Sequence, residues 1–243
     1  MSGKEKEEEV KTLTFNQTVV AITAFLEVAI HMILYVRQIY PADLFIRRKK
    51  YDTPVFQSRH PELNEYISGA VKAVKEEMLT RELDKVVVVI KDRQEIALER
   101  FIFSIQSILE IPPYAKKDHI IEAMTPRTLG QYFRSFLIKL SMMESQLGLL
   151  DDDGDDLSFA ILIELKDNKE PSVSHHGNPP PWMPALPQHT TLGASDGAQL
   201  HMIRAVETGI INLSLAVQES EEKLRRLRED ELKPEYPIYP EDS

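Results

Sequence analysis

The sequence predicts a single domain that combines helices with a β-sheet and continues into a long C-terminal arm. Residues 14–40 repeat apolar side chains three and four positions apart, which is the spacing of a helix buried on several sides. The β-branched run 86–90 (VVVVI) is the pattern of a strand covered on both faces, and 157–165 (LSFAILIEL) is again strand-like. Over residues 166–200 this periodicity gives way to Pro, Gly, Ser and His, which is typical of a functional or disordered loop. A chain of 243 residues can bury one sizeable core.

The first helix has boundaries that the sequence predicts. Thr14 and Gln17 have the spacing of a capping box, in which each side chain satisfies a free backbone N–H of the other. Pro41 ends the helix because it lacks an N–H and clashes with the preceding turn. A basic run, Arg47-Arg48-Lys49-Lys50, and an extended segment, 51–55, then follow.

A membrane-spanning helix is the alternative for residues 19–36, which are apolar over a sufficient length and precede the basic run. Glu27 and His31 lie in its middle, and a carboxylate there costs roughly 2.5–3.5 kcal/mol on insertion scales. We therefore expect a core helix of a globular domain. Glu27 and His31 would be a polar pair on its least buried side.

The later elements follow from the same patterns of periodicity and turn residues. A long arm then leads from the packed body to a last strand and a charged helical stub. The expected elements are a helix over 60–79, a polar connection over 81–85, a hairpin of 86–90 and 96–105 with a turn at 91–95, a loop over 111–114, a helix over 127–147, strands over 157–165 and 211–217, and a helix over 219–231.

Composition excludes several classes of function. Hydrophobic residues make up 42% of the chain and charged residues 28%, as in an ordinary globular protein. The net charge of −10 argues against broad nucleic-acid binding, which needs a basic surface. The absence of cysteine excludes disulfides, thiol catalysis and cysteine-type zinc sites. Residues 1–12 are expected to be a disordered charged lead without the apolar core of a signal peptide, and 232–243 a disordered tail.

The motifs that could carry catalysis or metal binding are weak. Residues 193–197 (GASDG) match the G-x-S-x-G pattern around Ser195, but a nucleophile elbow needs a strand before the serine and a helix after it. The acidic run 151–156 (DDDGDD) lacks the ligand spacing of a calcium loop, and His175-His176 has no spaced third ligand. The sequence predicts an interaction module with no catalytic activity, no metal and no cofactor.

Four stretches carry a resemblance to a known family. FLEVAIHMILYVRQIYP, FIRRKKYDTPV, HPELNEYI and DKVVVVIKDRQE closely resemble the HORMA-domain family, and within it the accessory subunits of DNA polymerase zeta. The resemblance is dense over 13–105, moderate over 128–147 and thin beyond. It implies an α+β fold of three helices on an antiparallel sheet, with a mobile C-terminal safety belt that closes over a partner's peptide. The domain would span 13–231, divided into a body (13–165), a belt (166–218) and a terminal charged helix (219–231).

The resemblance also implies which residues hold the peptide. In the family, an aromatic residue on the second helix and a tryptophan in the belt contact it, and these match Tyr66 and Trp182. The alternatives are a core tyrosine at position 66 and a loop aromatic at 182. The single tryptophan of the chain among prolines suits a peptide-gripping anchor.

Two further surfaces follow from the resemblance. Pairing with a second HORMA protein would use Arg134 on the third helix, with Arg47 and Gln38 as neighbours; the alternative for Arg134 is a solvated helix face. The surface that would bind a Y-family deoxycytidyl transferase scaffold falls at Leu200, Ser214 and Ala216. Ser214 and Ala216 are smaller than the polar and aromatic residues of the family at these positions.

The expected function is that of a nuclear, non-catalytic adaptor in translesion synthesis. It would bind a Pro-containing segment of the catalytic subunit of DNA polymerase zeta and bridge that subunit to the scaffold polymerase. The alternatives are a spindle-checkpoint HORMA protein that clasps another peptide, a serine hydrolase using Ser195, and a single-span membrane protein.

Overall fold

The computed structural model describes residues 11–108, 113–118, 120–148, 150, 157–167, 169–172 and 182–231. The chain folds into helices on one face of a sheet, with a separate two-stranded hairpin beyond the helices. The helices are α1 (Phe15–Val36), α2 (Pro61–Thr80), α3 (Pro126–Ser141), α4 (Glu144–Leu147) and α5 (Glu221–Glu231), and the strands are β1 (Phe45–Lys50), β2 (Thr53–Ser58), β3 (Leu83–Lys91), β4 (Ala97–Ser107), β5 (Ser158–Leu165), β6 (Gln199–Glu207) and β7 (Ile211–Glu219).

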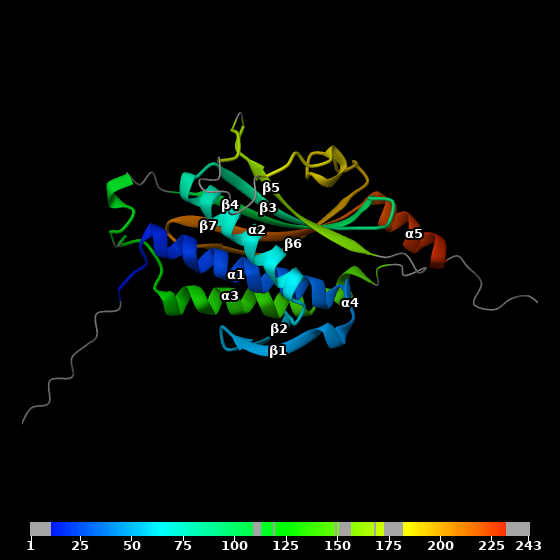
Figure 1. Ribbon diagram of the computed structural model, residues 1–243, viewed down its shortest axis with the longest axis horizontal. Helices are drawn as coiled ribbons and strands as arrows, with labels where there is room; N and C mark the ends of the chain where they lie inside the picture. Colours follow the sequence, from blue (N-terminus) through cyan, green and yellow to red (C-terminus); the bar gives the residue numbers. More distant parts are fainter. Residues whose placement is uncertain are drawn as a thin grey trace, which may run out of the picture.

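The main sheet has the order β5-β3-β4-β7-β6, and every pair of neighbours is antiparallel. Helices α1, α2 and α3 lie on one face of it (Figure 1). Residues 166–198, which we call the wrapping segment, connect β5 at one edge to β6 at the other. The α+β class, the three long helices and the antiparallel sheet expected from the sequence are therefore confirmed.

Helix α1 is the centre of the core, as its apolar stripes predict. The capping box of Thr14 and Gln17 is formed, so both backbone N–H groups at the helix start are satisfied. Phe25 stacks on Phe133 of α3 at 4.5 Å and meets Phe103 of β4 edge-to-face at 6.4 Å. In the part of the chain that the structure describes, α1 is the one helix long and apolar enough to cross a membrane. Its contacts with α2, α3 and β2 identify it as a core helix.

His31 differs from its predicted environment. Glu27 is half-buried, but the side chain of His31 is only 3% exposed and its Nδ1 has no hydrogen-bond partner. The prediction of a polar pair on the least buried side is therefore wrong for His31. Burial disfavours the imidazolium and lowers the pKa of His31 from 6.5 to about 4.

We predict that His31→Leu makes the domain less sensitive to acid. A depressed pKa means that the unfolded state binds the proton first, so the stability present above pH 6.5 falls as the pH drops towards 4. The shift corresponds to a loss of at most about 3 kcal/mol, which the leucine variant would not suffer. Urea unfolding between pH 7 and 4.5 measures this. His60→Asn, which changes an exposed histidine at a helix cap, should keep the parental pH dependence, and an equal slope for parent and His31→Leu would contradict the prediction.

Several boundaries differ from those predicted. Helix α1 ends at Val36 rather than at Pro41, because Gln38 has a positive φ of 52° and the chain turns there. The basic run is strand β1, and its hairpin turn lies at Tyr51–Asp52 within the segment predicted to be extended. The third helix breaks after Ser141 and resumes as the short α4. Strand β6 was not predicted at all.

Candidate functional site

The edge strand β5 carries a small aromatic cluster. Tyr66 projects from α2 and its ring meets Phe159 of β5 edge-to-face at 5.6 Å. Tyr40 also meets this phenylalanine edge-to-face, at 6.3 Å. The side chain of Tyr66 is 46% exposed, so it is not the core residue that its place in the apolar stripe would give. Burial and the proximity of Tyr66 raise the pKa of Tyr40, which stays neutral at physiological pH.

The outer edge of β5 has backbone groups directed away from the sheet. The Tyr66 hydroxyl accepts a hydrogen bond from the backbone N–H of Ile161 at 3.3 Å. Ile161 is paired with Val88 of β3, and its N–H is free for Tyr66 because alternate residues of an antiparallel strand direct their backbone groups outward. Phe159 and Ile163, two positions either side, share this direction. The edge can therefore receive another strand.

The first part of the wrapping segment is anchored on the helical face. The side chain of Glu77 on α2 is buried, and its Oε1 accepts hydrogen bonds from the backbone N–H of Ser172 at 2.9 Å and from the Ser172 hydroxyl at 2.7 Å. A buried carboxylate needs such donors, because an unpaired one is costly. Lys169 adds an ion pair to Glu82 at 3.3 Å. The chain after β5 is thus fixed along the end of α2.

The later part of the wrapping segment is anchored on the opposite face. Lys85 of β3 and Glu164 of β5 are register partners, joined by a 2.8 Å ion pair. Glu164 also accepts hydrogen bonds from the N–H and hydroxyl of Thr191, both at 2.6 Å. Burial alone would raise the pKa of Glu164, but the bonds from Lys85 and Thr191 outweigh it and hold that pKa below its usual value.

Two more contacts hold this second anchor. The guanidinium of Arg100 on β4 donates to the backbone carbonyls of Gln188 and His189. The His189 ring bonds the carbonyl of Glu95 at 2.8 Å. Because Arg100 pairs with Val89, which shares the face of Lys85, this anchor lies on the face away from the helices. The described parts of the wrapping segment therefore lie on both faces of the sheet, with β5 between them.

Trp182 lies in the stretch that joins the two anchors. It is half-buried and packs against the main core rather than lying loose in solvent. None of the described contacts of Tyr66 involves Trp182, so the structure places both beside the core without bringing them together. The prolines before it, and His175-His176, fall in 173–181, outside the described residues, as does the acidic run 151–156.

Comparison with known proteins identifies the family. Residues 18–126 match the family described as the HORMA domain. The Danio rerio protein named mitotic spindle assembly checkpoint protein MAD2B is 32% identical over 216 residues, which cover 87% of this chain and 95% of the relative. The chain belongs to the HORMA-domain family.

Other relatives and structures support the same assignment. The Gallus gallus MAD2B is 37% identical over a match that covers 64% of this chain and 69% of the relative. The Schizosaccharomyces pombe DNA polymerase zeta processivity subunit is 38% identical over a match that covers 59% of this chain and 66% of the relative. Among solved structures, a chain of the mitotic checkpoint complex has a TM-score of 0.66 at 19% identity, covering 83% of this chain and 98% of that one. C. elegans HTP-2 bound to a HIM-3 closure motif has a TM-score of 0.66 at 11% identity, covering 90% and 98%. These two structures share the fold of this HORMA domain.

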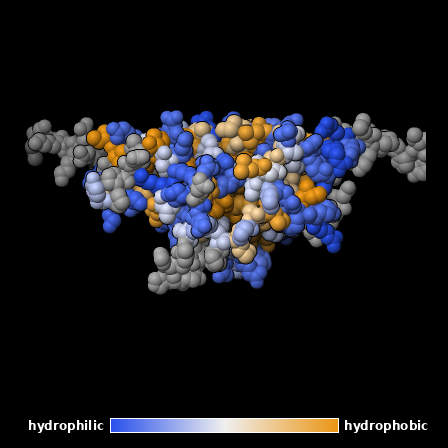
Figure 2. All heavy atoms as spheres, turned by 90° about the horizontal axis from the view of Figure 1, so that it is seen from above, coloured by the Kyte–Doolittle hydropathy of each residue, from blue (hydrophilic) through white to orange (hydrophobic). Residues whose placement is uncertain are grey.

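The face of the HORMA domain away from the helices has apolar side chains among hydrophilic ones (Figure 2). Leu200 pairs with Gln218 and Ala216 with Met202, while Ser214 lies two residues before Ala216, so the predicted trio shares one face of β6 and β7. Leu200 is 57% exposed, whereas Ala216 is buried. Sequence reasoning missed Met202, which is 65% exposed and lies between them. The available signal was the spacing of Leu200 and Met202, two positions apart, which places both on one face if the segment is a strand.

The three residues predicted for pairing with a second HORMA domain are not joined by any described contact. Arg134 is exposed on α3 and has no ion pair or hydrogen bond among the described residues, as its position off the apolar stripe predicts. Arg47 is exposed on β1. Gln38 donates instead to Glu144 of α4 at 2.9 Å.

The catalytic alternative finds no support in the local structure around Ser195. This serine lies on an irregular stretch between a short 3-10 turn and β6, so the strand–serine–helix order of a nucleophile elbow is absent there. Within the described ranges, no group of three His, Cys, Asp or Glu side chains is arranged to hold a metal ion.

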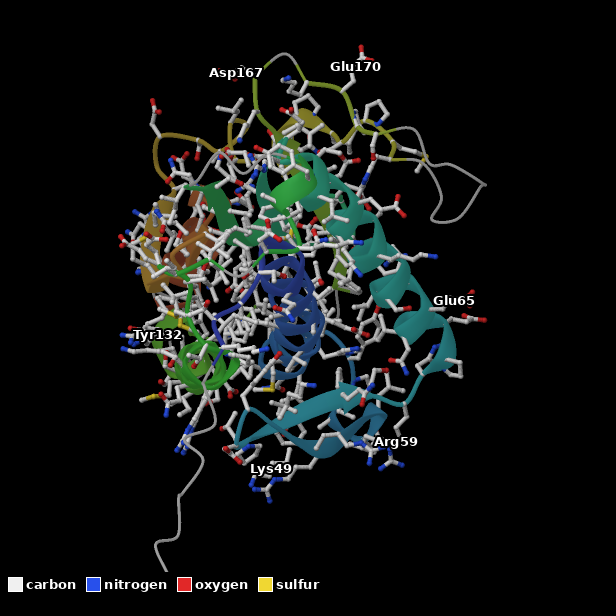
Figure 3. All side chains as sticks on the ribbon, turned by 90° about the vertical axis from the view of Figure 1, so that its left-hand side faces the viewer. Lys49, Arg59, Glu65, Tyr132, Asp167 and Glu170 are labelled. Atoms are coloured by element: carbon white, nitrogen blue, oxygen red, sulfur yellow. The ribbon has the colours of Figure 1, made fainter. Side chains whose placement is uncertain are left out.

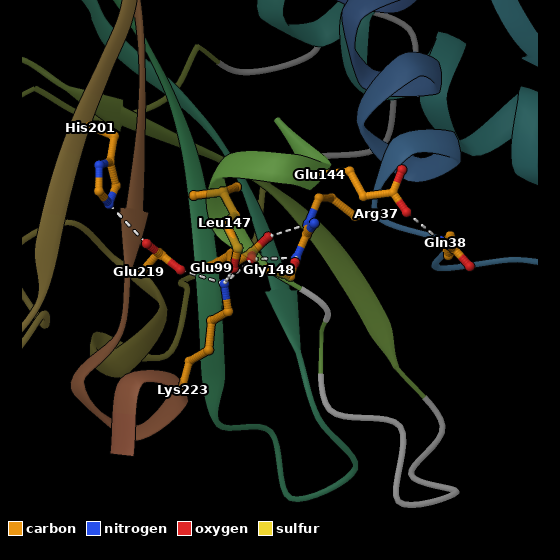
Figure 4. Close-up of polar contacts among 9 residues, drawn as sticks. All are labelled: Arg37, Gln38, Glu99, Glu144, Leu147, Gly148, His201, Glu219 and Lys223. Carbon is orange, nitrogen blue, oxygen red and sulfur yellow. Dashed lines mark hydrogen bonds and ion pairs between the residues drawn. The ribbon is translucent and has the colours of Figure 1, made fainter. Parts of the chain in front are cut away.

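A buried ion cluster fixes the C-terminal part of the HORMA domain to its body (Figure 4). Arg37, just after α1, makes a bidentate pair with Glu99 of β4 at 2.7 and 2.8 Å. Lys223 of α5 reaches the same carboxylate at 2.6 Å, the carbonyl of Leu147 at 2.7 Å and Glu219 of β7 at 2.5 Å. Sequence reasoning missed this cluster because its members come from separate parts of the chain.

Proposed function

We propose that this chain is a non-catalytic adaptor that clasps a Pro-containing peptide of the catalytic subunit of DNA polymerase zeta. The observation that carries the proposal is the position of β5, whose outer edge lies between the Ser172–Glu77 anchor and the Thr191–Glu164 anchor of the wrapping segment. A peptide added to that edge would be enclosed between the strand and the segment.

The chemistry of the edge suits an extended peptide. Backbone groups of the added strand would pair with those of β5, and the side-chain surroundings would provide selectivity. The Tyr66 hydroxyl now bonds the N–H of Ile161, so a peptide carbonyl can replace it without leaving a buried donor unpaired. Tyr40, Tyr66 and Phe159 offer ring faces and edges against which a proline ring can pack.

The names of relatives include both the polymerase complex and the checkpoint. The relatives in S. pombe and Drosophila melanogaster are named as subunits of DNA polymerase zeta, which supports the polymerase proposal, whereas the vertebrate ones are named mitotic spindle assembly checkpoint protein MAD2B. A spindle-checkpoint protein that clasps another peptide is the second candidate. On the polymerase assignment the chain would act in the nucleus, and the face of Leu200, Met202, Ser214 and Ala216 would contact the Y-family deoxycytidyl transferase scaffold.

We predict that peptide binding protects the wrapping segment from hydrogen exchange. Outside the two anchors, where the N–H groups of Ser172 and Thr191 are bonded, its Pro- and Gly-rich composition buries little surface by itself, so the remaining amides should exchange rapidly until a bound peptide adds contacts. Exchange over 166–199 is compared with and without a synthetic Pro-containing segment of the polymerase catalytic subunit. A spindle-checkpoint peptide serves as the competitor. Equal protection with and without the polymerase segment would contradict the proposal.

If two copies of this chain pair through α3, we predict that Arg134→Ala converts the dimer to a monomer and leaves peptide binding intact. The exposed guanidinium has donors free to bond across an interface. In a symmetric contact, one substitution removes the arginine from both halves of the interface. Light scattering over a concentration series measures this. Lys139→Ala, which removes another exposed cation of α3, is the matched control. If the variant dimerised as well as the parent, Arg134 would be an ordinary solvated residue of α3 and not part of the interface.

A further inference from the structure

The β1–β2 hairpin has one covered edge and one open edge. It forms a two-stranded sheet of its own, separate from the main sheet. On the β2 side the backbone N–H of Phe56 donates to the sulfur of Met32 on α1, at 3.2 Å, and β2 also contacts α3. Strand β1 lies on the outside of the hairpin (Figure 1). The outer edge of β1 is therefore the unpaired one.

The turn shows which backbone groups of β1 point outward. Tyr51 and Asp52 both have positive φ, 49° and 54°, as in a two-residue hairpin turn of type I′. Such a turn follows a hydrogen-bonded pair, here Lys50 with Thr53, and bonded pairs then alternate along the strands. Arg47 and Lys49 consequently direct their N–H and C=O groups away from β2. The outward N–H of Phe56, the partner of Arg47, agrees with this register.

The same edge is the most basic stretch of an acidic chain. Arg47, Arg48, Lys49 and Lys50 are consecutive and all exposed, whereas the whole chain has a net charge of −10. Arg47 and Arg48 have no ion pair among the described residues, and Lys49 reaches only the neighbouring Asp52, at 3.1 Å. Lys49 and Arg59 point away from the body at this end of the molecule (Figure 3). A shallow hollow lies beside the strand, lined by Arg47, Arg48, Lys49 and Pro54.

We propose that β1 is a docking edge for an acidic, extended segment of a partner protein, which adds as a third strand to the hairpin. Edge strands usually carry lysines because such charges discourage pairing with neutral strands. The same charges favour a strand of opposite sign, on both faces at once, because Arg47 and Lys49 alternate with Arg48 and Lys50. A run of acidic residues repels itself and is already extended, so little ordering is needed on binding.

Nucleic acid fits this edge less well than a peptide. Phosphate oxygens would pair with the cations but leave the carbonyl groups of Arg47 and Lys49 without donors, whereas a strand satisfies both kinds of backbone group.

The test uses a fluorescent peptide of alternating glutamate and aspartate with glycine at each end, titrated with the full chain at low salt. A second peptide of the same charge has every backbone amide of the acidic run N-methylated, so it cannot add as a strand. We expect the methylated peptide to bind at least about tenfold more weakly. Arg47→Glu with Lys49→Glu should weaken binding of the first peptide by a similar factor. Lys72→Glu with Lys117→Glu, which reverses two exposed cations elsewhere, should leave affinity within about twofold.

Three results would overturn the proposal. Equal binding of both peptides would show simple ion exchange rather than strand addition. Tighter binding of a short DNA duplex than of the acidic peptide would assign the edge to nucleic acid. The absence of saturable binding by the first peptide at low salt would leave β1 as a protected edge that admits no partner.

Discussion

Lys223→Met is expected to destabilise the domain by roughly 3–5 kcal/mol, because it leaves two buried carboxylates with too few cations. Glu99 would retain only Arg37, and Glu219 would retain only His201, whose ring lies 2.8 Å away and is partly exposed. The carbonyl of Leu147 would also lose its donor. Chemical denaturation at neutral pH measures the loss.

A double variant separates the lost ion pair from lost packing. Lys223→Met with Glu219→Gln removes one charge of each sign, so it should recover part of the stability that the single change costs. Arg225→Met, which changes an exposed arginine of the same helix, should cost far less, since its ion pairs with Glu222 and Glu229 lie on the surface. If Lys223→Met and Arg225→Met were equally mild, the cluster would not hold β7 and α5 against the body.

Tyr66→Ala and Trp182→Ala are each expected to weaken capture of the polymerase-derived Pro-containing peptide by about 2 kcal/mol or more, roughly thirtyfold in Kd. Tyr66 is the exposed wall of the aromatic cluster at β5, and Trp182 holds the stretch between the two anchors against the core. Titration of the labelled peptide with each variant measures the effect.

Tyr66→Phe is the matched control for the aromatic ring. It removes the hydroxyl that occupies the N–H of Ile161 but keeps the ring that packs on Phe159. On the strand-addition account this variant binds the peptide at least as well as the parent, because the peptide carbonyl meets a free donor. Unchanged affinity in both alanine variants would mean that the peptide binds elsewhere.

Local patterns predicted the elements whose burial follows a regular period. The stripes of α1, the β-branched run of β3 and the alternation in β7 all became the expected elements, because one period held along each of them. Strand β6 was not predicted because its pairing register shifts between Met202 and Arg204, which breaks the period-two pattern. Strand β1 was not predicted because it is mostly exposed and its extended form depends on pairing with β2.

The candidate site was harder to predict than the fold, because it is built from contacts between segments that are distant in the sequence. Resemblance located Tyr66 and Trp182, but the anchors through Glu77 and Glu164 join residues 95 and 27 positions apart, which no local pattern indicates. The contact of Arg37, just after α1, is also distant, since Glu99 lies 62 residues away. Buried polar pairs are specified by the assembled fold, so sequence periodicity does not find them.

A chemical crosslink at the first anchor is the most direct test of the claim that the peptide binds between β5 and the wrapping segment. The chain has no cysteine, so Glu77→Cys with Ser172→Cys creates one pair of thiols at the first anchor, which a short reductant-cleavable linker can join. Linked after the peptide has bound, the domain should hold it without release, and linked beforehand it should fail to take the peptide up. Reductant should restore both uptake and release of the peptide. As a control, the same linker between cysteines at the exposed positions Lys72 and Glu65 of α2 should change neither uptake nor release. If the peptide entered and left the crosslinked domain freely, it would not pass beneath the wrapping segment.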